Sequence, residues 1–498
     1  MSHKPLAFNC RVSLAPPTPH DRVADTDRLG EALELLGMRP LHVPLDIMQR
    51  LPRELRRNNF VLDVVVGRAE KGYIVLDIGN SAVYGVALDI GTTTLECVLF
   101  DLNEKKRIDS ASAVNPQVNQ GADVLARAQI AMTGGSDVLV NLLHEGINRL
   151  IREICDKNNV QKNSVYAIVA AGNTIMSHFF LGLDVGSVPI APNIPAVGRP
   201  VFCAARGAGI LVHPNAVLYV FPNAGSYVGG DIISGMVAIG IHSQESPVLF
   251  IDAGTNVEVA LGCGQWIMVG AGAAGPALEG GVADIGRKAE PGTISRVGID
   301  RASGELHLTV IGDKEPEGIC GSGLIDLVSE LFTMDIVDRA GKFNREKRGV
   351  EVRDGVAAFQ VFKSSEKELM FTERELQNFL RSKGAMFALL HVFLRSVGIK
   401  IGDIEKIYIS GALGCGINLD SAVNIGMLPD INREKIVPVG NSSLAGACMV
   451  LTDGALTEDV LHIRSLVTYR EMAEETDLLN VLQGALFLPH TDPELLKG

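Results

Sequence analysis

The sequence predicts a layered α/β protein with two similar lobes and a small α/β module in front of them. Strands and helices alternate from about residue 85 onward, and an Asp-x-Gly-Thr loop occurs twice, about one domain length apart. The 498 residues also exceed what a single hydrophobic core usually organises. With 47% hydrophobic and 21% charged residues, the composition is typical of globular domains.

The first 85 residues have a pattern of their own. Apolar periodicity predicts helices over Asp25 to Leu36 and Pro44 to Arg56. Runs rich in β-branched residues predict strands over Val61 to Val66, Tyr73 to Asp77 and Val83 to Leu88. We therefore expect a small α/β module that leads into a larger sheet, with its boundary near residue 85.

Longer elements follow this module. We expect strands within 85–101 and over 166–170, and helices over 121–132, 137–157 and 173–181. Thr372 and Glu375 have the spacing of a capping box, at the start of a long apolar helix through Val397. The expected domains are the module at 1–85, a first lobe at 86–245, a second lobe at 246–440, and a C-terminal helical segment at 441–498 that returns to the first lobe.

The repeated loop carries the most chemical information. Residues 87–94 read Ala-Leu-Asp-Ile-Gly-Thr-Thr-Thr and residues 250–256 read Phe-Ile-Asp-Ala-Gly-Thr-Asn, each between two apolar strands. A glycine in such a turn lets backbone N–H groups approach phosphate oxygens. Asp89 and Asp252 stand at strand ends, where a carboxylate holds Mg²⁺, usually through water, or orients an attacking water. The remaining residues expected to bind the phosphates are Gly91, Thr92, Thr93, Gly254, Thr255 and Asn256.

One loop of this kind would be a weak signal, because an ordinary turn produces the same pattern. Asp77-Ile78-Gly79-Asn80 is such a look-alike. Two loops in like context are what favour ATP and Mg²⁺ as the ligands.

Three glycine-rich stretches are further candidates. Asp231 follows Gly229-Gly230 and opens an apolar helix, a position that is also an ordinary helix start. The stretch 272–281, with Gly275 in it, either lines a ligand with its backbone or makes a structural bend. The turn that contains Gly411, Ala412 and Gly414 follows a strand, and its lack of bulk would let an adenine ring lie against the backbone.

Composition argues against several classes of function. A net charge of −13 and 5% aromatic residues argue against a nucleic-acid partner, which needs a basic face or stacking platforms. We find no signal peptide and no run of ~20 apolar residues, so we expect a cytoplasmic protein without a membrane partner.

The eight cysteines are scattered and lack cluster spacing, so we expect no iron–sulfur cluster. Cys320 and Cys415 lie in glycine-rich loops, and we interpret them as small apolar residues. His178, amid apolar neighbours, is interpreted as a core histidine with satisfied hydrogen bonds.

The order of these motifs resembles a known superfamily. Leu88–Thr94, Asn223–Gly235, Ile251–Glu258 and Ile407–Gly416 are similar to the first phosphate, connecting, second phosphate and adenosine motifs of acetate and sugar kinases, chaperone ATPases and actin. The stretches ALDIGTTTLECVLFDL, NPQVNQGADVLARAQI and GICGSGLIDLVSEL resemble more closely the reductive activators of corrinoid proteins, and residues 6–85 resemble that family's linker and middle domain.

The resemblance implies a duplicated actin/acetate-kinase-like (ribonuclease H-like) two-lobed ATPase fold. It also implies that Asp231 faces the γ-phosphate and that Lys383, in the long helix, contacts ribose or phosphate; the alternative for Lys383 is a side chain that snorkels at the rim. Asp89, Asp231 and Asp252 are then the catalytic residues.

The function implied by the resemblance is ATP-dependent reduction of cob(II)alamin to cob(I)alamin on a corrinoid methyl-transfer protein. Such activators normally carry an iron–sulfur domain, and this sequence has no cysteine cluster at either end. A separate reductase or ferredoxin is therefore the expected electron donor. Two alternatives stay open: a small-molecule phosphotransferase, and a nucleotide-gated binding module without turnover. The oligomeric state, a homodimer included, is also open.

Overall fold

The computed structural model describes residues 4–254, 256–272, 282–411, 414, 416–472 and 477–497. The chain forms two compact units: unit 1 is Met1–His242 with Ser442–Leu466, and unit 2 is Ser243–Asn441 with Val467–Gly498. Of the C-terminal segment 441–498, residues Ser442–Leu466 belong to unit 1 and Val467–Gly498 to unit 2. Within the described ranges, no helix combines the length and apolar character that crossing a membrane requires.

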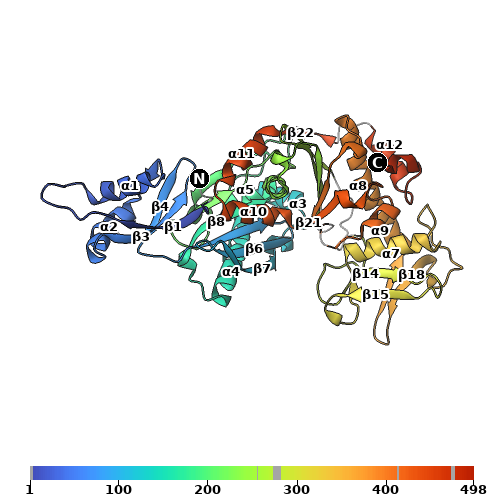
Figure 1. The fold of residues 1–498 in the computed structure, drawn as a ribbon. Coiled ribbons are helices and arrows are strands. Elements are labelled where there is room, and N and C mark those ends of the chain that lie inside the picture. The colour runs from blue at the N-terminus through green and yellow to red at the C-terminus, as the bar shows by residue number, and fades with distance from the viewer. Residues whose placement is uncertain are drawn as a thin grey trace. The chain divides into compact units, whose positions relative to one another are not determined.

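Unit 1 begins with a small α/β module, drawn in blue in Figure 1. Its strands are in the order β1-β3-β4-β2, with helices α1 and α2 packed on them. Ile47, Leu51 and Leu55 recur every four residues on α2 and are fully buried, which explains why this segment forms an amphipathic helix. The predicted helices and strands of the module are confirmed. The observed bounds are β1 (Ala7–Ser13), α1 (Asp25–Leu35), β2 (Leu41–His42), α2 (Leu45–Arg57), β3 (Val61–Arg68) and β4 (Tyr73–Ile78).

The rest of unit 1 is a six-stranded sheet in the order β7-β6-β5-β8-β10-β9. β5, β6 and β7 form an antiparallel meander, while β8 and β10 run parallel to β5. The strands are β5 (Tyr84–Ile90), β6 (Thr94–Asp101), β7 (Lys106–Val114), β8 (Val165–Gly172), β9 (Val201–Ala204) and β10 (Val217–Val220). The helices are α3 (Val124–Ile130), α4 (Ser136–Lys157), α5 (Thr174–Leu181), α6 (Gly230–Ile239), α10 (Ser442–Thr452) and α11 (Leu456–Leu466).

Helices cover both faces of this sheet. Val86, Leu88 and Ile90 on β5 share one core with α4 and α5. Gly85 and Asp89, which alternate with them, face α10 instead. Every residue of β8 is buried, as is expected of a central parallel strand. Asp89 therefore leaves the sheet on the face that α10 covers.

Unit 2 contains a second six-stranded sheet in the order β21-β20-β11-β12-β13-β22, and two three-stranded sheets. The long helix α8 packs on β13 through Leu389 and Phe393, and its predicted capping box between Thr372 and Glu375 is confirmed. The strands of the large sheet are β11 (Val248–Ala253), β12 (Val257–Cys263), β13 (Trp266–Gly272), β20 (Ile407–Gly411), β21 (Ile436–Gly440) and β22 (Val467–Arg470).

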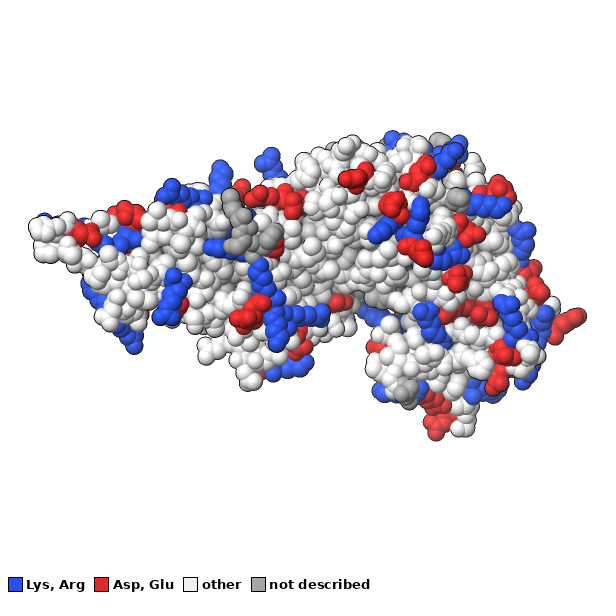
Figure 2. Space-filling view, viewed as in Figure 1, with Lys and Arg blue, Asp and Glu red and all other residues white. Residues whose placement is uncertain are grey.

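The remaining elements of unit 2 surround this sheet and the small sheets. The small sheets consist of β14 (Thr293–Ile299), β15 (Leu306–Val310) and β16 (Gly318–Ile319), and of β17 (Val350–Arg353), β18 (Val356–Lys363) and β19 (Glu368–Thr372). The helices are α7 (Gly321–Thr333), α8 (Glu373–Ser396), α9 (Leu419–Asn424) and α12 (Leu478–Ala485). Charged side chains of both signs are intermixed on the surface seen in Figure 2.

The two large sheets repeat one topology. In each, an antiparallel meander (β5-β6-β7 or β11-β12-β13) is extended beside its first strand by two parallel strands (β8 and β10, or β20 and β21). The duplicated loops occupy the same place in both sheets, between the first and second strands of the meander. The predicted duplicated two-lobed α/β fold is thus confirmed.

Candidate functional site

The first repeated loop connects β5 to β6 and is held by asparagine side chains from two other elements. Asn115 donates from Nδ2 to the Gly91 carbonyl over 2.9 Å and from its backbone N–H to the Thr93 carbonyl over 2.9 Å. Asn173, the N-cap of α5, donates from Nδ2 to Thr92 Oγ1 over 3.0 Å. A β-carbon at Gly91 would lie 2.5 Å from the Thr94 carbonyl oxygen, so this turn requires glycine. The loop is thus held rigidly from outside.

Asp231 lies in the first turn of α6, two residues after its N-cap Gly229. One carboxylate oxygen accepts the backbone N–H of Ile232 over 2.8 Å. Burial, and secondarily the charge of Asp89, raise the pKa of Asp231 to about 7. Asp231 therefore has a helix-start contact and also an electrostatic interaction with the aspartate of the first loop.

Gly229 and Gly230 allow the start of α6 to pack closely against Asn173 and Phe221. A β-carbon at Gly229 would lie 2.4 Å from Asn173 Cα, and one at Gly230 would lie 2.8 Å from Phe221 Cβ. The two glycines are thus required by close packing, Gly229 against the start of α5 and Gly230 against Phe221. This packing brings the amino end of α6 and the carboxyl end of β8 together.

Ser443, in the first turn of α10, is a contact of Asp89 that sequence reasoning missed. Its hydroxyl donates to Asp89 Oδ1 over 2.8 Å. A serine at the start of an apolar helix has no distinctive pattern, and the two residues are 354 positions apart in sequence. No sequence signal could have indicated this pair.

In unit 2, Asp252 is the next-to-last residue of β11, beside the carboxyl end of β20. Asp252 is in register with Ser410 on the parallel strand β20, and Ala253 with Gly411. Gly411 has φ +74°, and a β-carbon there would lie 2.5 Å from the Ala253 carbonyl oxygen and 2.6 Å from Asp252 Oδ1. Glycine at 411 is therefore required by both its backbone and its neighbours.

Gly254, Asn256 and Gly414 are the other predicted residues of unit 2 that the structure describes near this strand end. Gly254 and Asn256 are exposed, and the Gly254 N–H bonds to the Asn256 carbonyl over 2.9 Å. At Gly414, a β-carbon would lie 2.6 Å from the Ile409 carbonyl oxygen. Thr255, Gly275, Ala412 and Cys415 lie outside the described residues.

Lys383 is fully buried on α8 and binds the C-terminal segment of unit 2. Its Nζ donates to the carbonyl oxygens of Ala485 (2.7 Å), Phe487 (2.8 Å) and Pro489 (2.5 Å). Burial lowers the pKa of Lys383 to about 7. Because three carbonyls already surround the ammonium group, we correct the expectation of a ribose or phosphate contact, and that of snorkelling at the rim, and assign Lys383 a structural role.

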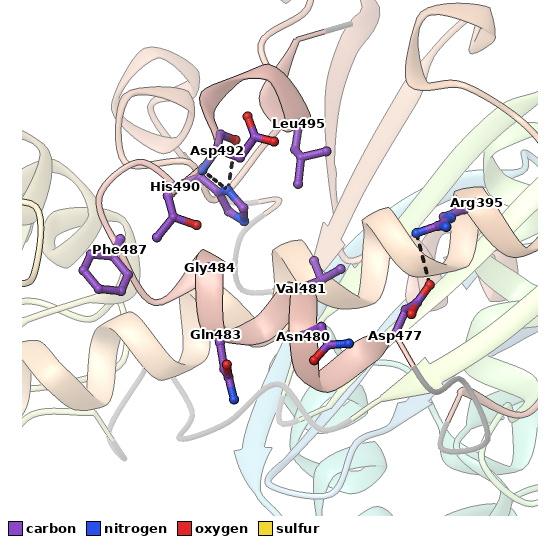
Figure 3. Close-up of a pocket in the computed structure, with 11 residues that line it drawn as sticks. Arg395, Asp477, Asn480, Val481, Gln483, Gly484, Phe487, His490, Asp492 and Leu495 are labelled. Atoms are coloured by element: carbon purple, nitrogen blue, oxygen red, sulfur yellow. Dashed lines mark hydrogen bonds and ion pairs between the residues drawn. The ribbon is translucent and has the colours of Figure 1, made fainter.

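A pocket of about 550 Å³ lies in unit 2 between α8, α12 and the segment that follows α12 (Figure 3). Arg395 and Asp477 form an ion pair at its edge over 3.1 Å. None of the residues predicted to bind the nucleotide lines it. The pocket therefore belongs to a different part of unit 2 from the strand end that carries Asp252.

The histidine and cysteine interpretations can be compared with the structure. His178 is buried, lies 2.6 Å (Nδ1) from the Thr174 carbonyl oxygen and accepts the Ala196 N–H at Nε2 over 2.9 Å, so the core interpretation is confirmed. Cys320 is buried, with its sulfur 3.1 Å from Ser322 Oγ. In the part of the chain that the structure describes, no three histidine, cysteine, aspartate or glutamate side chains gather as metal ligands.

Mg²⁺ bound through water does not require such a cluster. Carboxylate oxygens are the donors that this ion prefers. Burial is the main cause of the raised pKa of Asp231, and the charge of Asp89 raises it further, so a cation beside both carboxylates would offset part of that repulsion. These residues fit a magnesium–nucleotide ligand.

Comparison with known proteins covers nearly the whole chain. Residues 1–82 match the family described as the RACo linker region, residues 84–244 the RACo middle region, and residues 246–498 the C-terminal domain of RACo, the ASKHA domain. The N-terminal module thus corresponds to the linker alone, which corrects the expectation that residues 6–85 resemble both the linker and the middle domain; the middle region is residues 84–244.

Individual relatives agree with this assignment. The solved structure of a reductive activator for a corrinoid, iron–sulfur protein is 34% identical, with a TM-score of 0.93, over 99% of this chain and 81% of that chain. The corrinoid activation enzyme RamQ of Eubacterium limosum is 27% identical over 84% of this chain and 74% of that protein. A [Co(II) methylated amine-specific corrinoid protein] reductase of Methanosarcina barkeri is 26% identical over 77% and 73%. This chain belongs to the RACo family.

Proposed function

We propose that this protein uses ATP to promote the reduction of cob(II)alamin to cob(I)alamin on a corrinoid methyl-transfer protein. The observation that carries the proposal is the pairing of Asp89 with Asp231 beside a rigidly held glycine turn, in a chain whose relatives are named as activators or reductases of corrinoid proteins. An external reductase or ferredoxin supplies the electron.

Each residue of the site has a proposed task. The backbone of Gly91, Thr92 and Thr93 binds phosphate oxygens, as do Gly254, Thr255 and Asn256 of the second loop. Gly275, Gly411, Ala412 and Gly414 remain proposed contacts of the nucleotide. Asp89 and Asp252 would hold Mg²⁺, usually through water, and the ion would neutralise charge on the phosphates.

Asp231 is proposed to act on the attacking water. With a pKa of about 7, its carboxylate can accept a proton at neutral pH. The water oxygen forms a bond to the γ-phosphorus, and the bond from that phosphorus to the β,γ-bridging oxygen breaks, which releases ADP and phosphate. The proton of the water passes to Asp231.

Hydrolysis and reduction are separate chemical steps in this proposal. The external donor gives one electron to Co(II), which becomes Co(I). ATP contributes by favouring one conformation of the activator over another, and the resulting effect is limited by the difference in the partner's affinity for the two conformations.

A spectroscopic assay tests the proposal. The protein, ATP, Mg²⁺, a low-potential reductant and a cob(II)alamin-loaded corrinoid methyl-transfer protein are mixed anaerobically, and the corrinoid absorption spectrum is followed. Cob(I)alamin should accumulate only with ATP and not with the Asp89→Ala variant, while Asp27→Asn, at an exposed position of α1, should behave like the parent. Reduction at equal rates with and without ATP would contradict the proposal, and ADP release that depends on a small hydroxyl or carboxylate substrate would favour a phosphotransferase.

A further inference from the structure

We propose that Ser443 is a positioning residue that links the Asp89 carboxylate to helices α6 and α10. The chain leaves unit 1 shortly after α6 and re-enters it at the start of α10. The inference deepens the proposed function and rests on it. Ser443 is 5% exposed and has two bonds of different kinds: its hydroxyl donates to Asp89 Oδ1 over 2.8 Å, and its backbone carbonyl accepts the Ser234 hydroxyl over 2.7 Å.

The second of these bonds belongs to a tight crossing of α6 and α10. A β-carbon at Gly446 would lie 2.0 Å from the Ser234 carbonyl oxygen and 2.5 Å from Ser234 Oγ. Only glycine at 446 permits this approach of the two helices. The crossing brings together α6, which carries Asp231, and α10, which carries Ser443.

In the sequence, the two crossing helices stand on either side of the larger part of unit 2, Ser243–Asn441. After α6 ends at Ile239, the chain leaves unit 1 at His242, and it re-enters unit 1 at Ser442, the first residue of α10. Ser443 is thus the second residue after re-entry. The residue that holds Asp89 is therefore next to the point where the chain passes from one unit into the other.

The chemical consequence is a fixed carboxylate. A hydroxyl that donates to one carboxylate oxygen restricts rotation of the side chain, and a bond to a charged acceptor is stronger than one between neutral groups. Ser443 therefore sets the orientation in which Asp89 meets Mg²⁺ and links that orientation to the helix pair. It acts through Asp89 and does not touch the nucleotide itself in this proposal.

Magnesium-dependent nucleotide binding tests the role of Ser443. Binding of a non-hydrolysable ATP analogue is measured by calorimetry at increasing Mg²⁺ concentrations. Ser443→Ala should raise the Mg²⁺ concentration for half-maximal binding about tenfold, the loss expected for a hydrogen bond to a charged group. Ser443→Thr keeps the hydroxyl and should restore most of the response. Ser234→Ala removes the bond that connects Ser443 to α6 but leaves the Ser443 hydroxyl on Asp89, so it should raise the Mg²⁺ requirement by a smaller factor than Ser443→Ala does.

A double-mutant cycle separates positioning from general stability. In an Asp89→Ala background, adding Ser443→Ala should cause no further change in the Mg²⁺ requirement. Ser443→Cys provides a near-isosteric variant with a weak donor, which should shift the Mg²⁺ requirement even if the alanine variant folds poorly. Equal Mg²⁺ requirements for Ser443→Ala and the parent, with the parent binding normally, would overturn the positioning role alone. A parent that binds no nucleotide with Mg²⁺ would overturn the proposed function together with it.

Discussion

Tyr166 donates its phenolic hydrogen to Asp77 Oδ2 over 2.7 Å, and this bond joins the N-terminal module to the central strand β8 of the first large sheet. The phenol oxygen also accepts Asn80 Nδ2 over 2.8 Å, and Arg50 donates to Asp77 Oδ1 over 2.8 Å. Burial, and secondarily Asp77, raise the pKa of Tyr166. The Asp77-Ile78-Gly79-Asn80 look-alike thus uses both polar side chains to bind a tyrosine.

The first prediction compares two buried tyrosines of the same sheet. Tyr166→Phe removes a donor from the buried Asp77 carboxylate and should destabilise the protein by about 1–3 kcal/mol. Tyr219 is equally buried, and its hydroxyl has no hydrogen-bond partner within the described residues. Tyr219→Phe should therefore be neutral or stabilising. Thermal unfolding of both variants gives the comparison, and a larger loss at Tyr219 than at Tyr166 would contradict it.

The second prediction concerns the anchor of the C-terminal segment. Lys383→Met leaves three buried carbonyl groups without their donor and should cost on the order of 3 kcal/mol. Residues 485–489 should then exchange their amide hydrogens faster, as measured by mass spectrometry. Lys342→Met, at an exposed ion pair with Glu373, should change neither quantity by much. Unchanged exchange in the Lys383 variant would mean that other contacts hold the segment.

Contacts between residues close in sequence could be predicted, whereas contacts between distant residues could not. The capping box of Thr372 and Glu375 was predictable because its two residues are three positions apart and both bonds are local. The aspartate–glycine loops were predictable for the same reason. The carbonyls around Lys383 belong to residues more than 100 positions away, and their backbone atoms carry no residue-type signal. Ser443 was missed for the same physical reason, since only the folded chain brings it to Asp89.

The third prediction uses the raised pKa of Asp231. The folded protein holds this proton up to about pH 7, whereas the unfolded chain releases it near pH 4, so the folded state binds more protons in between. The contribution of Asp231 to stability should therefore fall as pH rises from about 4 to about 7. Asp231→Asn removes this dependence, and its melting temperature relative to the parent should rise over that range and level off above it. The comparison is made without nucleotide or Mg²⁺, and a difference that stays constant with pH would contradict the raised pKa.

The fourth prediction concerns redox content. A cluster requires thiolates, whereas burial raises the pKa of Cys97 and Cys448 to about 12 and that of Cys155 to about 11. A protein of this sequence, purified anaerobically, should be colourless and contain no stoichiometric iron or sulfide. Metal analysis and the visible spectrum check this, and one cluster per chain or per dimer would contradict it. The proposed function requires an external electron donor only if the protein contains no cluster of its own.

The last prediction connects the N-terminal module to corrinoid activation. Strand β8 begins beside the Tyr166–Asp77 bond and ends at Gly172, next to the Asn173 side chain that holds Thr92 in the first phosphate loop. One buried strand thus joins the module to the loop. Deleting the module would expose Tyr166. It would also expose Leu451, whose backbone carbonyl accepts the Leu6 N–H. A single substitution is therefore the cleaner test.

Tyr166→Phe should slow ATP-dependent formation of cob(I)alamin on the partner at least about threefold, because it loosens the contact between the module and β8. Its affinity for the ATP analogue should stay within about twofold of the parent's, because Asn173 still holds Thr92. Tyr219→Phe should leave both quantities unchanged. Both are measured below the melting transition of each variant, by the corrinoid spectrum and by calorimetry. Equal loss of nucleotide affinity and of cob(I)alamin formation in Tyr166→Phe would mean that the bond supports the nucleotide loop alone, and no change in either would mean that the module does not take part in sensing the partner through β8.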